Sequence, residues 1–142
     1  MPDMNRIMDI ATSGLRAQRT RMTVTASNIA NAQTTRTESG GPYRRRDPVF
    51  ETERVGSPFA SALERRLRAV SVSRIQADAR DFVTRYLPNH PDADEEGLVR
   101  FPNVNLVEEQ ANMVSASRGF QANLLVMQKV RGMAEALLKI GQ

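Results

Sequence analysis

Residues 105–140 read NLVEEQANMVSASRGFQANLLVMQKVRGMAEALLKI, and this stretch decides the fold. Asn105 with Glu108 three residues later is typical of a capped helix start. Residues spaced by seven lie on one narrow face of a helix, as in the seam of a coiled coil. The stretch therefore predicts one long helix that ends near Ile140. Its predicted seam consists of Leu106, Met113, Phe120, Met127 and Ala134, with Ala116, Leu124, Val130 and Leu137 between them.

A second pattern of the same kind opens the chain. Capped by Asp3 or Asn5, it predicts a helix that runs to about Asn31. Two such helices can pair with each other and with those of neighbouring subunits, which indicates a part of an assembly. The seam of this first helix consists of Met8, Leu15, Met22 and Ile29, with Ala11, Gln18, Thr25 and Ala32 between them.

The segment between the two patterns is different in character. Turn residues predict loops, short alternating runs predict extended pieces, and Ser57 before Pro58 favours a short helix. The predicted fold is mainly α: paired terminal helices with a small, irregular β-containing middle. We divide the chain into 1–33, 34–104 and 105–142. Within the middle we expect a loop over 33–41, extended pieces at 43–55, 70–75, 82–87 and 98–101, and the short helix over 57–68.

Composition narrows the class of protein. The 142 residues include no cysteine, which excludes disulfides and thiolate metal sites, and only 5% aromatic residues, which favours a thin core. The net charge is +4 and most basic residues are arginine, so a basic coiled-coil module that binds nucleic acid or a membrane surface is the alternative hypothesis. Because no stripe of like charge is present, we expect no nucleic-acid partner. No apolar run is long enough to span a bilayer.

One acidic loop is the only candidate for a metal-binding or catalytic site. Residues 90–97 begin like a calcium loop, but Asn103 stands where the bidentate glutamate belongs. A solvated turn whose carboxylates pair with arginines explains the segment more simply. His90 is the only histidine, and no nucleophile or acid–base pair has a pocket-forming context. We therefore expect no enzyme, no cofactor and no metal site.

Five stretches resemble the flagellar axial protein family, and in particular its basal-body rod proteins. They are residues 26–32 (ASNIANA), 40–46 (GGPYRRR), 90–97 (HPDADEEG), 102–105 (PNVN) and 112–118 (NMVSASR). The resemblance fades over residues 51–86. It implies a non-enzymatic subunit of the proximal rod, which crosses the periplasm, transmits torque and lines an export channel. It also implies type III export without a cleaved signal peptide, in agreement with an N-terminus that shows no signal-peptide pattern.

The implied partners are other rod proteins, copies of this chain, and ring and export-gate components at the rod base. Asn28 and Asn31 have two readings: they bind a neighbouring main chain, or they face water at a frayed helix end. From the seams we expect a subunit interface made by Met8, Ala11, Leu15, Met22, Asn28, Ile29, Asn31, Met113, Phe120, Leu124, Met127, Val130 and Leu137.

Overall fold

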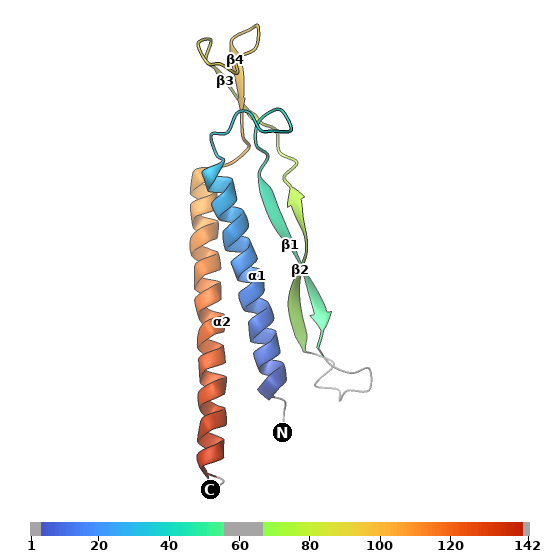
Figure 1. Cartoon of the computed structure of the whole chain (residues 1–142), viewed down its shortest axis with the longest axis vertical. Coiled ribbons are helices and arrows are strands. Elements are labelled where there is room, and N and C mark those ends of the chain that lie inside the picture. Colours follow the sequence, from blue (N-terminus) through green and yellow to red (C-terminus); the bar gives the residue numbers. More distant parts are fainter. Residues whose placement is uncertain (1–3, 56–66, 141–142) are drawn as a thin grey trace.

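The computed structural model describes residues 4–55 and 67–140. Helix α1 (Met4–Ala30) and helix α2 (Leu106–Ile140) run antiparallel along the long axis, so that both termini lie at the same end (Figure 1). A two-stranded ribbon of β1 (Arg46–Arg54) and β2 (Arg68–Ala77) lies along the other side of α1. The molecule is thus a narrow slab of three layers in the order α2, α1, ribbon.

The start of α2 follows the capping prediction. Asn105 Oδ1 accepts hydrogen bonds from the main-chain N–H groups of Val107 (3.0 Å) and Glu108 (3.4 Å), which satisfies donors that the first turn leaves without partners. Glu108 and Glu109 lie in the first turn and Lys139 in the last, where each charge is favourable to the helix dipole. The helix ends near Ile140, as predicted.

Two glycines let the helices approach closely. A Cβ atom at Gly14 would lie 2.8 Å from the Asn123 side chain, and one at Gly119 would lie 3.1 Å from that of Gln18. Each helix therefore places a glycine opposite a large polar residue of its partner. The predicted pairing of the terminal helices is confirmed, and it occurs within the chain.

Strand β1 lies within the extended piece predicted over 43–55, and strand β2 is longer than the piece predicted over 70–75. Strands β1 and β2 pair antiparallel with Arg46 opposite Ala77 and Arg54 opposite Arg68, and a bulge interrupts the register between Val49 and Phe50. The ribbon is twisted, so β1 lies beside α1 near the upper end in Figure 1 and β2 lies beside it further down. There, Ser13 Oγ accepts a hydrogen bond from the main-chain N–H of Val70 at 3.1 Å.

A small second sheet forms a tip beyond the helix ends. Strand β3 (Val83–Tyr86) pairs antiparallel with β4 (Leu98–Phe101), and residues 87–97 connect them. Gly97 has a φ of 75°, and a Cβ there would lie 2.9 Å from the Tyr86 ring. We use the word tip below for residues 83–101.

The prediction of a mainly helical fold with a small β-containing middle is confirmed. The predicted strand over 70–75 lies inside β2, and the one over 82–87 contains β3. The predicted short helix over 57–68 falls almost wholly outside the described residues, and Arg68 already belongs to β2. The core is thin, as the low aromatic content indicates: among the described residues its buried apolar side chains are Ala11, Ala17, Val24, Tyr43, Val99, Pro102 and Ala116.

Candidate assembly surface and the polar junction that fixes its register

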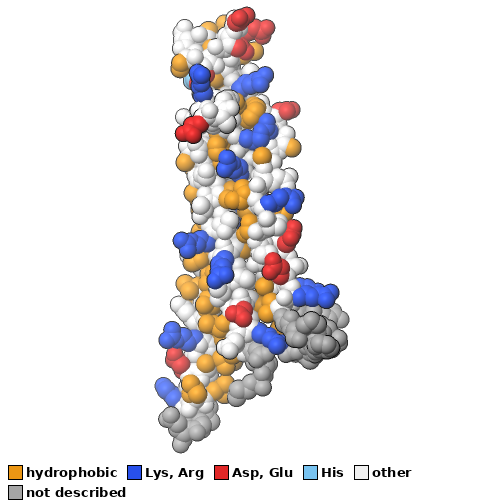
Figure 2. Space-filling model, turned by 45° about the vertical axis from the view of Figure 1, so that its right-hand side comes forward, with side chains coloured by type: hydrophobic (Ala, Val, Ile, Leu, Met, Phe, Trp, Pro, Cys, Tyr) orange, Lys and Arg blue, Asp and Glu red, His pale blue; other side chains and the backbone are white. Residues whose placement is uncertain are grey.

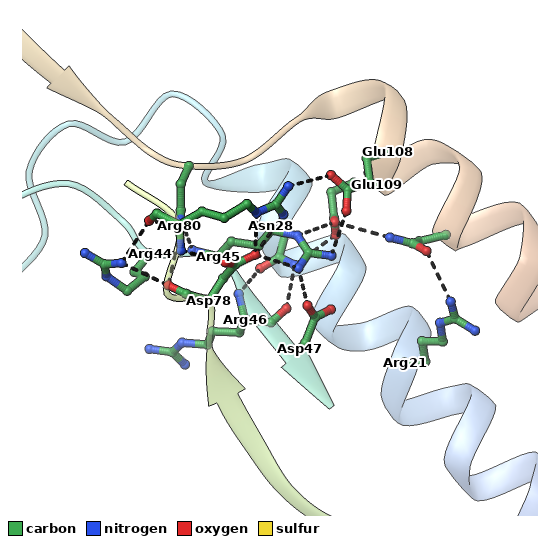
Figure 3. Close-up of polar contacts among 12 residues, drawn as sticks. Arg21, Asn28, Arg44, Arg45, Arg46, Asp47, Asp78, Arg80, Glu108 and Glu109 are labelled. Atoms are coloured by element: carbon green, nitrogen blue, oxygen red, sulfur yellow. Dashed lines mark hydrogen bonds and ion pairs between the residues drawn. The ribbon is translucent and has the colours of Figure 1, made fainter. Parts of the chain in front are cut away.

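A buried polar junction joins the end of α1, the start of β1 and the start of α2 (Figure 3). Asn28 is 1% exposed, and its amide binds the main chain of Arg46 twice. Its Oδ1 accepts from the Arg46 N–H (3.0 Å), and its Nδ2 donates to the Arg46 C=O (2.8 Å). This is the pattern that a neighbouring strand would supply. The first reading of Asn28 is therefore confirmed, with the main chain of the same subunit as its partner.

Asn31 follows the other reading more closely. Its Nδ2 donates to the C=O of Ser27 at 2.9 Å, one turn back in its own helix, and its Oδ1 accepts from the Thr34 hydroxyl at 3.3 Å. These bonds close the helix end locally. Asn28 thus binds a distant main-chain segment, whereas Asn31 makes only local hydrogen bonds at the helix end.

An ion pair forms the centre of the junction. Arg45 Nε donates to Glu109 Oε1 at 2.8 Å, and the side chains are 4% and 1% exposed. Arg45 also pairs with Asp47, and with Asp78 at 3.0 Å. Burial opposes the charge on Arg45, but hydrogen bonds and attraction from Asp47 and Glu109 outweigh it and raise the pKa of Arg45. Buried charges that keep so many partners impose one geometry on the segments that carry them.

From α2, Glu109 binds α1 and the segment that leads into β1 at once. Its Oε2 accepts from Asn28 Nδ2 at 2.8 Å, while Oε1 accepts from Arg45. One turn further along α2, Asn112 Oδ1 accepts from Arg21 Nη2 of α1 at 3.1 Å. Because these contacts are specific in geometry, they fix how α1 and α2 align along each other.

The junction also binds the two chain segments that connect the tip to the rest of the molecule. Asn103, directly after β4, accepts from the Arg45 N–H (2.9 Å) and donates to the Arg80 C=O (2.9 Å). Arg80 in turn pairs with Asp78 (2.7 Å) and Glu108 (3.0 Å). Hydrogen bonds from Arg80 lower the pKa of Asp78 from 3.8 to about 2. The chain segments on either side of the tip are therefore tied to the start of α2.

The residues predicted at a subunit interface lie at different depths in the chain. Ala11 and Asn28 are buried within it, and Leu124 and Leu137 are exposed, at 41% and 49%. The remaining nine are partly buried: Met8, Leu15, Met22, Ile29, Asn31, Met113, Phe120, Met127 and Val130. Several therefore face the partner helix of their own chain. Their role between subunits stays a prediction.

The outer face of α2, turned away from α1, carries apolar residues that the sequence analysis did not single out. Val107, Val114 and Leu125 are 74%, 51% and 57% exposed. They are spaced by seven and eleven residues, which places them on one line along the helix. The sequence contains this spacing, but the stronger seven-residue pattern of the predicted seam lies on the other face of the helix. Further exposed apolar residues of α2 are Val126, Met133 and Leu138.

An apolar groove lies at the open end, where α1 begins and α2 ends. Its volume is about 450 Å³. The groove is lined by Met4, Asn5, Met8, Val130, Arg131, Ala134, Leu137 and Leu138. The helix pair thus has a polar, closed end at the junction, and an apolar end where α1 begins and α2 ends, whose groove none of the residues 4–55 and 67–140 fills.

The acidic loop forms a turn through its own hydrogen bonds. Asp92 accepts from the Thr35 hydroxyl (2.7 Å), and Asp94 Oδ1 accepts from the main-chain N–H groups of Glu96 (3.0 Å) and Leu98 (2.7 Å). Within residues 4–55 and 67–140, no three His, Asp or Glu side chains converge as they would around a metal ion. Neither described helix is long and apolar enough to cross a membrane.

Two family models match the chain at its helices. The model described as "Flagella basal body rod protein" matches residues 8–36, and that described as "Flagellar basal body rod FlgEFG protein C-terminal" matches residues 95–140. The matched regions contain Asn28 on one side and Glu109 on the other, the two residues that join the helices at the junction. These matches define the class as a flagellar basal-body rod protein.

Curated relatives match over almost the whole length. Each is named "Flagellar basal-body rod protein FlgC": that of Borreliella burgdorferi is 40% identical over 95% of each chain, and that of Agrobacterium fabrum is 38% identical over all of both. That of Salmonella typhimurium is 38% identical over 96% of each. The chain therefore belongs to the FlgC family of flagellar basal-body rod proteins, and it is a structural subunit of that rod.

Proposed function

We propose that this chain assembles in the periplasmic part of the flagellum through its terminal regions, 1–33 and 105–142, with 34–104 as an insertion between them. The observation that carries the proposal is the outer face of α2. Val107, Val114 and Leu125 form an apolar line on a helix that already has one partner. Exposed apolar lines of this length are typical of surfaces that other proteins cover.

The predicted interface residues take two roles in this proposal. The partly buried ones, such as Leu15 and Phe120, shape the helix pair, and the exposed ones, Leu124 and Leu137, contact neighbours directly. Asn28 and Ala11 act from inside by holding the pair in register. The neighbours are other rod proteins, copies of this chain, and ring and export-gate components at the rod base.

A thin core also suits export. The described core contains only small and medium-sized apolar side chains besides Tyr43. A chain with so little buried apolar surface unfolds at low cost, which favours passage through a narrow type III channel. After passage, neighbours in the rod supply the missing burial, and interlocked helices resist the torque that the rod transmits. The membership in a rod family disfavours the alternative of a module for nucleic-acid or membrane-surface binding.

The test replaces an exposed apolar residue of the outer face by a charged one. Leu125→Asp is expected to leave export intact and to block rod completion, because the new carboxylate would have to be buried between subunits. Thr52→Asp, at an exposed polar position of β1 outside the proposed interface, is the control for adding a carboxylate. Export into the medium and motility in a strain without its own copy are the readouts. Motile cells that carry Leu125→Asp would overturn the proposed interface.

A further inference from the structure

We infer that the tips of two copies of this chain dock side by side, with the acidic turn of residues 94–97 of one copy in a polar cleft beside the tip of the next. The inference rests on the proposed function, because it names one partner and one surface within the assembly. It starts from two features at the same end of the slab, the cleft and the turn (Figure 1).

The cleft lies between the loop that follows α1 and the loop of the tip, and its volume is about 560 Å³. All of its lining residues belong to 35–42 and 91–100, inside the described ranges. The two walls are joined by the Thr35 hydroxyl, which donates to Asp92 at 2.7 Å. The first wall is closed on itself, since the Thr37 N–H donates to the Gly41 C=O at 2.9 Å. The cleft is therefore formed before any partner arrives.

The charge in the cleft that lacks a partner is Arg100. Within residues 4–55 and 67–140 its side chain makes no ion pair or hydrogen bond. Arg36 pairs with Asp92 only at 3.8 Å, and its side chain is 78% exposed. The carboxylates of the cleft are already occupied, because Asp92 also accepts from Thr35 and Asp94 accepts from two main-chain N–H groups. The cleft thus presents two guanidinium groups that can bind carboxylates from outside.

The acidic turn presents such carboxylates in a fixed geometry. The Gly97 N–H donates to the Asp94 C=O at 3.0 Å, so Glu95 and Glu96 are the two central residues of a tight turn. Asp94 Oδ1 holds the same turn by accepting from the N–H groups of Glu96 (3.0 Å) and Leu98 (2.7 Å). Glu95 and Glu96 are exposed, and their carboxylates have no partner in the part of the chain that the structure describes. A turn held in this way loses little freedom on binding.

The cleft and the turn are complementary in charge but do not meet within one copy. Asp94 lines the cleft, whereas Glu95 and Glu96 do not. Figure 2 shows acidic side chains gathered at the end that carries the tip, with basic side chains directly below them. Arg36 and Arg100 of one copy can therefore pair with the two glutamates of a neighbour whose tip lies beside it. Opposite charges orient such an encounter and disfavour contact between two acidic turns.

The position of the two features determines how the copies are arranged. The cleft and the turn are different surfaces, so the contact is heterologous and leaves a free cleft and a free turn on the pair. Because both lie at the same end of the slab, the contact joins copies side by side and repeats around an axis. The hydrogen bond from the Arg45 N–H to Asn103 holds the tip in place, so docked tips also orient the helix pairs that carry them.

The chain contains no cysteine, so engineered cysteines report the contact in assembled rods. Two full-length variants, Pro91→Cys in the cleft and Glu95→Cys in the turn, are produced together in a strain without its own copy, and the isolated rods are oxidised. We expect a mixed disulfide-linked dimer, at least about fivefold more abundant than from Thr52→Cys with Glu95→Cys, because only thiols that lie close together can be joined. Rods that contain either variant alone should give no linked dimer. Equal yields from both pairs, or no mixed dimer, would overturn the inference.

A charge exchange gives a second readout. Adding Glu96→Arg to the turn variant is expected to lower the yield of mixed dimer about two- to fivefold, since an exposed ion pair contributes little. Adding Arg100→Glu to the cleft variant should restore the yield, and Glu51→Arg on β1 is the control for the charge change. If the cysteine variants form no rods, motility of chains with Glu96→Arg alone and with both exchanges decides in the same way. An unchanged result with Glu96→Arg, or no recovery with both, contradicts the docking.

The outcome separates this inference from the proposed function. If no mixed dimer forms while Leu125→Asp still blocks rod completion, the proposed function stands and the contact between tips is wrong.

Discussion

The two ends of the helix pair are opposites. At the junction, Glu109 binds both Asn28 and Arg45, and all three side chains are almost fully buried within the chain. At the open end, Leu137 and Leu138 remain exposed beside a groove that nothing in the described chain fills. Polar contacts specify geometry, and apolar contacts supply the driving force of association. The comparison teaches that one end sets the shape of the subunit, whereas the other carries exposed apolar side chains, which we propose are available to neighbours.

The largest expected effect comes from breaking the junction. Glu109→Ala removes a buried partner of both the Arg45 guanidinium and the Asn28 amide, while Asp47 and Asp78 still pair with Arg45, and we expect a loss of about 1.5–3 kcal/mol in the free energy of unfolding. Urea denaturation followed by circular dichroism measures it. The control is Glu135→Ala, which removes only the exposed pair with Arg131 and should cost about 0.5 kcal/mol or less. Equal losses would mean that the junction does not set the fold.

A glycine comparison tests the close approach of the helices. Gly132→Ala meets open space and should raise the free energy of unfolding by about 0.5–1 kcal/mol through helix propensity. Gly14→Ala brings the same propensity gain but places a methyl group 2.8 Å from Asn123, so the gain should be lost or reversed. Thermal melting of the two variants side by side gives the difference. A stabilised Gly14→Ala variant would show that the helices are not packed this closely.

The smallest expected effect is a dependence of folding stability on pH through Asp78. The folded state holds the pKa of Asp78 near 2, below its ordinary value of 3.8. A lowered pKa means that the carboxylate stabilises the fold above about pH 4 and that this contribution is lost as the pH falls towards 2. Melting temperatures measured between pH 5 and pH 2 should therefore fall less steeply in Asp78→Asn than in the unchanged chain. Parallel curves would assign the acid sensitivity to other groups.

The sequence predicted the helices well because their signals are local. The seven-residue spacing, the Asn105 cap and the alternation over 70–75 each act within a few turns or residues. The terminal pairing followed from them. Strand β2 was underestimated because the alternation covers only residues 70–75, whereas pairing with β1 and contact with α1 stabilise a longer strand.

The junction could not be predicted in the same way. Arg45 and Glu109 lie 64 residues apart, and Arg45 has an arginine on either side that is not buried. The local pattern does not distinguish Arg45 from Arg44 and Arg46, because its contacts with Glu109, Asp78 and Asn103 form only in the folded chain. The outer face of α2 could not be distinguished from its inner face for another reason. This helix is apolar on both faces, so periodicity alone does not tell which face meets α1 and which stays exposed.

Hydrogen exchange of the backbone amides, in the isolated chain and in assembled rods, tests the central claim most directly. In the isolated chain we expect slow exchange over residues 109–123, which the junction and the glycine contacts hold, and fast exchange over residues 127–139. In rods both regions should exchange slowly. Uniform protection of α2 in the isolated chain, or fast exchange around Glu109, would contradict the account.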